Sequence, residues 1–366
     1  LYPDGSGYVP YVYAFGSSFS KYNRDDDHKL SDSYSGQTRP AMATEQGVTF
    51  GFFVDTDSNL RYVDFSTGGE TVVNANNSAR SMTISSDARY FAFTTTAMDN
   101  KIYLADLSDA NASTQVIEIP SISYSEDKTA STTVLFADGL NFNAKNSQLI
   151  FDVANCISLP NDPCTDSGGG YTFWTIGIYN MAAGTVSYPI SSQDPKISIG
   201  FPAFSRTNDY VVALDLIDYR SGSAKSNTML ADFNQGKVVQ LIDHGDGEIF
   251  SSPTFWGDDK YLVYASTYSD GLSTYRLPID IANLQPTGQP QWISNDVAEY
   301  PIAHRAGNLD TSAPIQVDSN VVQLLGDSSN GYKSRVVLKN SQPFDVKIVS
   351  IEVSSDFVQN GINQVI

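Results

Sequence analysis

Histidine, cysteine and methionine are scarce in this chain, with three, two and five copies among 366 residues. So few imidazole and thiol groups exclude a structural zinc site of the paired cysteine and histidine kind. The three histidines, His28, His244 and His304, also leave little for acid–base catalysis. No GxSxG turn, P-loop or GxGxxG motif occurs, so the sequence carries no signature of a specific reaction.

A second absence is helical periodicity, because no stretch repeats its apolar residues every three to four positions. No apolar run reaches about 18 residues, so no membrane-spanning segment is predicted. The chain is instead rich in strand and turn formers, with 21 Tyr, 19 Phe and 26 Gly. We therefore expect an all-β fold.

Basic residues are the third shortage: 22 Lys and Arg face 41 Asp and Glu, which gives a net charge of −19. Nucleic acid is excluded as a partner, because neutralising its phosphates needs a basic face. A strongly negative surface favours solubility and is typical of extracellular or saline settings. The acidic residues could also form cation sites, which the total charge cannot locate.

The two cysteines, Cys156 and Cys164, enclose seven residues in the segment CISLPNDPC. This spacing predicts a local disulfide that pins a loop, and hence an oxidising compartment. Two free thiols are the alternative. The chain begins at Leu1 without a signal peptide, which suggests a processed or excised piece of a longer secreted, periplasmic or cell-surface protein.

Residues 78–107, SARSMTISSDARYFAFTTTAMDNKIYLADL, predict three short antiparallel strands joined by polar turns. Similar units recur at intervals of about 40 to 60 residues, which indicates a propeller or a solenoid. The apolar residues that end the first strand of each copy are Met42, Ile84, Phe142, Phe204, Phe255 and Ala303. The first five copies continue with three more strands, which makes one four-stranded propeller blade per copy.

The sixth copy stops after its first strand, near residues 299–307. Three strand-like segments within residues 8–32 could complete it. We therefore predict a six-bladed β-propeller over residues 1–307, whose last blade joins the two ends of that range and leaves no open sheet edge.

The first strand with its Ser-x-Asp turn, then YFAF, then KIYLADL, resembles the PD40-type repeat of TolB-like six-bladed propellers. The resemblance covers residues 1–307 and is best in the second copy, since the other copies have lost the Pro-Asp-Gly turn. It implies a mostly non-catalytic protein that binds partners at the ends of its central channel. Polysaccharide-active relatives are also implied.

Beyond a linker at residues 308–314, the segment 315–366 alternates like the strands of a β-sandwich. Its run VVLKNSQPFDVKIVSIEVSSDF resembles the Ig-like modules of the ASH or choice-of-anchor D type. Such a sandwich needs about 100 residues, so only part of the module is expected here.

Propellers place function where their innermost strands converge on the axis. In the six-copy register, two rings of residues should meet at one channel mouth. They are Thr38, Arg80, Asp138, Gly200, Ser251 and Glu299, and then Arg39, Ser81, Gly139, Phe201, Ser252 and Tyr300. Of these, Arg39, Arg80, Asp138, Glu299 and Tyr300 are the candidate ligand-binding residues, for a peptide terminus, a sugar acid or a cation. The alternative is a self-satisfied ring of ion pairs. Asp138 with Glu299 is the one carboxylate pair that this register offers a glycosidase.

Asp55, Asp57 and Asn59 match the start of a calcium loop, although the later Gly and Glu are missing. Ca²⁺ is therefore the one possible cofactor, with an ordinary hairpin turn as the alternative. The acidic segments 24–28 and 243–248 allow the same two readings. The long loop 155–170, which holds both cysteines, could be a recognition element or could shield a blade edge.

The sequence thus predicts a non-catalytic binding or scaffold unit of a larger extracytoplasmic protein, whose partner is a protein or another domain of the same polypeptide. The rival prediction is a cation-assisted enzyme that acts on an acidic polysaccharide through carboxylates at the channel mouth. A purely structural spacer is the third possibility.

Overall fold

The computed structural model describes most of residues 41–294 and eight short strand segments outside that range. The gaps within 41–294 are 46–47, 55–56, 58, 65–68, 75–78, 98, 109–112, 123–131, 160, 166–169, 193, 257–258, 267–272. The outer segments are 2–3, 8–9, 14–15, 19–20, 315–317, 325–327, 331–333 and 338–340. The chain divides into two compact units, Leu1–Ala306 and Gly307–Ile366.

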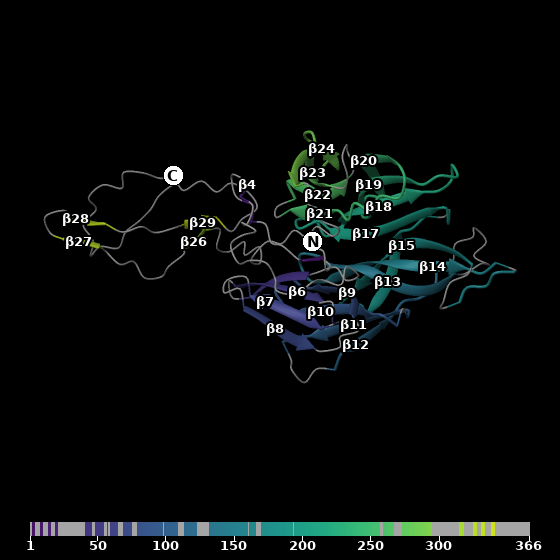
Figure 1. Cartoon of the computed structure of the whole chain (residues 1–366), viewed down its shortest axis with the longest axis horizontal. Coiled ribbons are helices and arrows are strands. Elements are labelled where there is room, and N and C mark those ends of the chain that lie inside the picture. The colour runs from purple at the N-terminus through teal and green to yellow at the C-terminus, as the bar shows by residue number, and fades with distance from the viewer. Residues whose placement is uncertain are drawn as a thin grey trace. The chain divides into compact units, whose positions relative to one another are not determined.

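The first unit holds five consecutive antiparallel sheets of propeller-blade type (Figure 1). The first comprises β5 (Ala41–Glu45), β6 (Val48–Val54), β7 (Leu60–Asp64) and β8 (Gly69–Asn74). The second comprises β9 (Ala79–Ile84), β10 (Tyr90–Thr95), β11 (Lys101–Asp106) and β12 (Gln115–Glu118). The third comprises β13 (Thr133–Phe142), β14 (Gln148–Ile157), β15 (Tyr171–Asn180) and β16 (Thr185–Ile190).

The fourth comprises β17 (Ile197–Phe204), β18 (Val211–Asp218), β19 (Lys225–Asp232) and β20 (Lys237–Asp246). The fifth comprises β21 (Thr254–Trp256), β22 (Tyr261–Ser266), β23 (Ser273–Asp280), β24 (Gln285–Pro286) and β25 (Gln291–Ser294). In this fifth sheet β24 and β25 pair with opposite ends of β23. The all-β prediction is confirmed, and no helix occurs among the described residues.

The first strand of each blade lies against the first strand of the next: β5 against β9, β9 against β13, β13 against β17 and β17 against β21. Each blade then continues outward in sequence order through its second, third and fourth strands. This is the arrangement of a propeller, in which the first strands surround the axis.

The hydrophobic core lies between neighbouring blades, so both faces of the middle strands are buried. In β14, Leu149 and Phe151 pack with residues of the second blade, whereas Ile150 packs with residues of the fourth. Successive side chains of a strand point to opposite faces, which explains why these strands are apolar throughout. A polar residue at such a position must find its hydrogen bonds inside the protein.

Five blades lie within the described residues, and the sixth blade stays a prediction. Its segment 299–307 and most of residues 8–32 lie outside the described part of the chain. The described pieces are β1 (Tyr2–Pro3) paired with β2 (Tyr8–Val9), and β3 (Ala14–Phe15) paired with β4 (Phe19–Ser20). The pairing of β2 with β1 was not expected from the sequence.

The second unit contributes β26 (Ile315–Val317) paired with β29 (Leu338–Asn340), and β27 (Leu325–Asp327) paired with β28 (Gly331–Lys333). These two short ladders do not support an Ig-like sandwich, so that part of the prediction is not confirmed. No helix of the described chain is long and apolar enough to cross a membrane.

Candidate functional site

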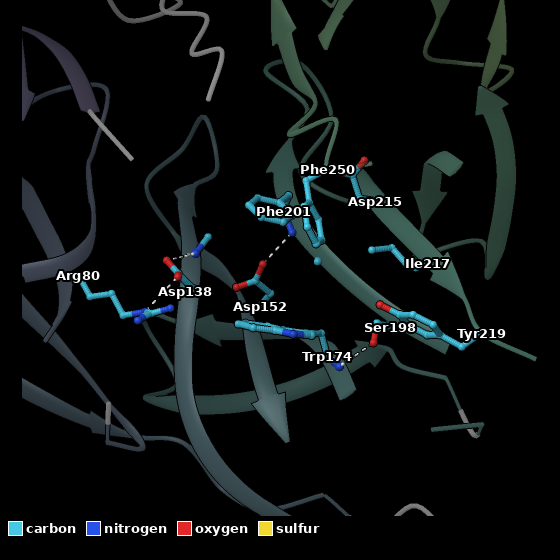
Figure 2. A pocket seen from close by; sticks show the side chains of 12 residues that line it. Arg80, Asp138, Asp152, Trp174, Ser198, Phe201, Asp215, Ile217, Tyr219 and Phe250 are labelled. Atoms are coloured by element: carbon cyan, nitrogen blue, oxygen red, sulfur yellow. Dashed lines mark hydrogen bonds and ion pairs between the residues drawn. The ribbon is translucent and has the colours of Figure 1, made fainter. Parts of the chain in front are cut away.

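A cavity of about 210 Å³ opens among the second, third and fourth blades (Figure 2). Its lining combines one cation, three carboxylates and four aromatic rings. The lining residues are Arg80, Asp138, Gly139, Asp152, Trp174, Ser198, Gly200, Phe201, Asp215, Ile217, Tyr219 and Phe250. We refer to this space as the blade cavity.

Arg80 of β9 and Asp138 of β13 form an ion pair in this lining, with Nε 3.3 Å from Oδ2. The side chains are 31% and 28% exposed, so the pair is partly accessible. The Arg80 guanidinium lies over the ring of Phe136, 4.4 Å from its centroid. Burial raises the pKa of Asp138, and the charge of Arg80 opposes that shift.

Asp138 faces Asp152 directly across the β13–β14 ladder, so two carboxylates lie side by side. Opposed like charges destabilise a sheet unless other groups stabilise them. Backbone hydrogen bonds stabilise both carboxylates here. Gly139 N–H donates to Asp138 Oδ1 at 3.0 Å, and Phe201 N–H donates to Asp152 Oδ2 at 2.7 Å.

Asp152 and Asp215 occupy equivalent places on the second strands of successive blades. Asp152 reaches forward to the Phe201 N–H of the fourth blade, and Asp215 Oδ2 accepts the Ser252 N–H of the fifth at 2.9 Å. Both side chains are 2% exposed. Asp152 therefore links its blade to β17, the first strand of the fourth blade, and Asp215 links its blade to the segment just before β21.

The N–H groups that bind Asp152 and Asp215 belong to residues with a left-handed backbone, within a first strand or just before it. Gly139, Phe201 and Ser252 stand at the same position of three blades, with φ of 57°, 50° and 45°. A Cβ at Gly139 would lie 2.8 Å from Asp152 Oδ2, so this position has room only for glycine. Gly200 is similarly close, at 3.1 Å from the same oxygen.

The aromatic side of the cavity is formed by Trp174 of β15, Phe201 of β17, and Tyr219 and Phe250 of two connecting segments. The rings of Phe201 and Phe250 lie 5.3 Å apart, and Phe250 is 47% exposed. Tyr219 donates to Glu248 Oε1 at 2.9 Å. Burial is the main cause that raises the pKa of Tyr219 to about 12, and this hydrogen bond is the second.

A chain of hydrogen bonds runs from Asp215 away from the cavity to His244 of β20. Ser251 Oγ donates to Asp215 Oδ1 and lies 2.7 Å from Thr228 Oγ1. Thr228 Oγ1 lies 2.8 Å from His244 Nε2, and His244 Nδ1 lies 2.8 Å from Ser266 Oγ.

The direction of this chain follows from its charged end. If Asp215 is ionised it only accepts, so Thr228 donates to Ser251 and His244 Nε2–H donates to Thr228. Neutral His244 then accepts the Ser266 hydroxyl proton at Nδ1. Burial lowers the pKa of His244 to about 4, which keeps the ring neutral at pH 7.

Of the predicted ring-mouth residues, the structure brings Arg80 and Asp138 together in the cavity lining. Gly139, Gly200 and Phe201 join them. Ser251 and Ser252 bind Asp215 instead. Arg39, Glu299 and Tyr300, together with Thr38, lie where the structure gives no description, so the Asp138–Glu299 pair is not tested.

The predicted calcium loop falls between β6 and β7, as a hairpin turn would. Asp57 is exposed and Asn59 is half-buried, whereas Asp55 lies outside the described residues. The part of the chain that is described contains no cluster of three His, Cys, Asp or Glu that could hold a metal ion. Residues 24–28 and His304 are also undescribed, and residues 243–246 form the end of β20.

The predicted disulfide is confirmed: Cys156 at the end of β14 is bonded to Cys164, with their Cα atoms 5.9 Å apart. Sequence reasoning missed Asp152 and Asp215, together with Trp174, Tyr219 and Phe250 of the aromatic wall. The signal for Asp152 and Asp215 was a single acidic residue inside an otherwise apolar second strand, in IFDVA and again in ALDLI. Tyr219 and Phe250 gave no comparable signal.

No family model matches the chain, and no curated protein matches it. Among solved structures it is similar to TolB from Acinetobacter baumannii, with 18% identity, TM-score 0.45, and 65% of this chain and 51% of that chain covered. It is also similar to an oligogalacturonate lyase from Vibrio parahaemolyticus, with 13% identity, TM-score 0.45, and 91% and 82% covered.

A third similar structure is a puromycin-hydrolysing peptidase from Mycobacterium tuberculosis, with 13% identity, TM-score 0.43, and 84% and 46% covered. The chain thus spans about half the length of the TolB structure. All three TM-scores are below 0.5, so the propeller arrangement rests on the sheets of this chain.

Proposed function

We propose that this chain is a non-catalytic binding unit that receives one side chain or one chain terminus of a protein partner in the blade cavity. The observation that carries the proposal is the lining itself, in which a few fixed polar groups stand among aromatic rings. Binding sites are typically built in this way, on a rigid scaffold that is largely formed before the ligand arrives.

The size of the cavity supports a small inserted group. Sites for whole small-molecule ligands usually measure about 300–1,000 Å³. The blade cavity, at about 210 Å³, is smaller. Exposed Phe250 beside it supplies an aromatic anchor of the kind that dominates protein–protein binding energy.

The setting is proposed as extracytoplasmic, either secreted, periplasmic or on a cell surface. The Cys156–Cys164 disulfide supports this, because such bonds persist in oxidising compartments. The partner is proposed to be a protein or another domain of the parent polypeptide. We keep the domain limits 1–307, 308–314 and 315–366, with the sixth blade and the Ig-like module, as part of this proposal.

Selection of a random peptide library on the full chain tests the proposal. We expect selected peptides to lose affinity on Phe250→Ala by about 10-fold or more, as for an anchor residue. Tyr210→Ala is the matched control, because Tyr210, just before β18 of the fourth blade, is also 47% exposed but does not line the cavity. Equal loss in both variants, or selected peptides unaffected by Phe250→Ala, would contradict a role for the cavity.

The second candidate function is a hydrolase or lyase of acidic polysaccharides. The observation in its favour is the Asp138–Asp152 carboxylate pair, in which Asp138 has a raised pKa, as a general acid requires. Against it, the three carboxylates of the lining outnumber its one guanidinium, and this excess of negative charge repels a polyanion unless a cation intervenes.

Assays for new reducing ends or unsaturated products on polygalacturonate and alginate, with and without Ca²⁺, test this candidate. Activity that disappears in Asp138→Asn would establish the enzyme and refute the binding proposal. Dependence on Ca²⁺ that disappears in Asp57→Asn would support the proposed cation ligands Asp55, Asp57 and Asn59.

A further inference from the structure

The geometry of the blade cavity points to one ligand class: we propose that it binds an organic ammonium group. The inference deepens the proposed function, because the inserted group of the partner would then be a lysine side chain or an amino terminus.

The aromatic wall is the first reason. Aromatic rings carry negative charge on their faces, and cages of several rings bind ammonium ions when water is excluded. Trp174, Phe201, Tyr219 and Phe250 supply four rings to one small cavity. Figure 2 shows the indole of Trp174 on one side of Asp152, and the rings of Phe201 and Phe250 on the other.

The fixed charges are the second reason. Three carboxylates line the cavity, and its one guanidinium, Arg80, is already bonded to Asp138. Asp152 is held by the Phe201 N–H within the aromatic wall, so its position is set before any ligand arrives. A carboxylate fixed among ring faces complements a compact cation better than it complements a neutral or an anionic group.

The charge of the whole chain is the third reason. A net charge of −19 attracts cations toward the surface and repels anions, which raises the rate of encounter with a basic partner. The cavity volume of about 210 Å³ suits one ammonium group with a short carbon stem.

The test titrates the full chain with tetramethylammonium chloride and n-butylammonium chloride, followed by calorimetry and tryptophan fluorescence. tert-Butanol serves as the neutral analogue and sodium acetate as the anion. We expect saturable binding of both ammonium ions with a Kd in about the millimolar range, and no saturation with the two controls.

The variants locate the site. Phe250→Ala should weaken binding about 3- to 10-fold through loss of one ring, and Tyr210→Ala should leave it unchanged. Asp152→Asn should weaken it at least about 10-fold, whereas Asp232→Asn should not. Asp232 is the matched control, since it is 4% exposed, accepts the N–H groups of Asn234 and Gln235, and does not line the cavity. Equal binding of tert-butanol, no ammonium binding, or binding that Phe250→Ala and Asp152→Asn leave unchanged would overturn the inference.

Peptides separate the two possible sources and the two proposals. A lysine-free peptide with a free amino terminus, an N-acetylated peptide with one lysine and an N-acetylated peptide without lysine are compared. If library peptides bind through Phe250 regardless of charge, the binding function stands and the ammonium inference fails. If small ammonium ions bind but no library peptide does, the site stands and the protein-partner proposal fails.

Discussion

At the residue scale, a left-handed backbone conformation recurs at Gly139, Phe201 and Ser252, which lie in or just before the first strands of three blades. Left-handed φ values cost a residue with a Cβ about 1–2 kcal/mol, and glycine almost nothing. Two of the three blades nevertheless carry a side chain there. The conformation aims the N–H of Phe201 and of Ser252 at a buried carboxylate of the preceding blade, which offsets part of the cost.

Ser252→Gly should stabilise the protein by about 1 kcal/mol. The substitution relieves φ of 45° and removes a buried Ser252 hydroxyl that has no hydrogen-bond partner among the described residues. The backbone N–H that binds Asp215 is kept. The predicted gain of about 1 kcal/mol is a net value, because the greater freedom of glycine in the unfolded chain costs about 0.5–1 kcal/mol of a larger gain.

Urea denaturation measures the change, with Ser252→Ala as the control. Alanine removes the hydroxyl but keeps the strained φ, so it should gain less than glycine. A destabilised Ser252→Gly would show that the side chain at this position matters more than the backbone.

His244 should titrate with a pKa of about 4, against 6.5 for an ordinary histidine. Burial favours the neutral ring, and neighbouring Asp243 only partly opposes this shift. Between pH 6.5 and 4 the unfolded chain therefore binds a proton that the folded chain does not. The contribution of His244 to the free energy of unfolding is complete above pH 6.5. It decreases as the pH falls, by about 3 kcal/mol near pH 4.

NMR titration of the three imidazole rings gives the pKa directly. Urea denaturation between pH 7 and 4.5 gives the linked stability, and the difference between the native chain and His244→Gln isolates this residue. Asp138 and the other carboxylates titrate in both proteins. A His244 pKa near 6.5, or the same pH dependence in the variant, would refute the buried neutral ring.

The position of Arg80 beside Asp138 could be predicted from the sequence, because the blade repeat places both on neighbouring first strands. Asp152 and Asp215 could not be predicted in this way. Their side chains are set by which face of a doubly buried strand they occupy, and by a backbone N–H of the next blade. Tyr219 and Phe250 stand in connecting segments, whose course no strand periodicity specifies.

At the element scale, strand order and blade boundaries followed closely from alternation and polar turns. All five described blades contain the four strands that the sequence predicted, and the fifth adds the short β24. The residue-by-residue pairing of the strands could not be predicted, because it contains bulges such as the register shift between Gly200 and Ala203 in the β17–β18 pair. A bulge adds a residue to one strand without changing the apolar pattern, so sequence alone does not reveal it.

The disulfide loop after β14 depends on Gly170, which has φ of 65°. A Cβ there would lie 2.6 Å from Cys156 Sγ, 2.7 Å from Cys164 Sγ and 2.6 Å from the Ile157 carbonyl oxygen. Gly170→Ala should therefore destabilise the protein by at least about 2 kcal/mol, since clash is added to backbone strain.

Gly222→Ala is the matched control, because Gly222 has φ of 88° but nothing within 4 Å of the added Cβ. It should cost about 1 kcal/mol, from backbone strain alone. Thermal and urea unfolding of both variants measure the difference. Equal destabilisation would mean that the disulfide does not pack against residue 170.

At the scale of the whole molecule, the sequence predicted both the propeller arrangement and its closure, and the described residues confirm only the arrangement. Each blade is specified by local alternation within about 60 residues, whereas closure needs pairing between segments almost 300 residues apart. The incomplete sixth copy predicted this pairing, and the sixth blade remains a prediction because residues 299–307 and most of residues 8–32 lie outside the described part of the chain. The net charge of −19, by contrast, is counted directly from the sequence and needs no structure.

This charge should make the protein more stable as salt is added. The 41 carboxylates outnumber the 22 basic groups, and repulsion among the excess negative charges opposes the compact state. Salt screens this repulsion. The Debye length falls from about 30 Å at 0.01 M to about 10 Å at 0.1 M. Screening worth about 1 kcal/mol over that range would raise the Tm by about 1 °C for a chain of this size.

Thermal unfolding in NaCl and in CaCl₂ at equal ionic strength separates screening from specific binding. Equal increases in Tm indicate screening alone, because both salts then act only through ionic strength. A larger increase in CaCl₂ that Asp57→Asn removes would instead indicate a cation bound at the β6–β7 turn. A Tm that is constant or falls with NaCl would show that ion pairs such as Arg89–Asp106 and Lys145–Asp209 outweigh the net repulsion.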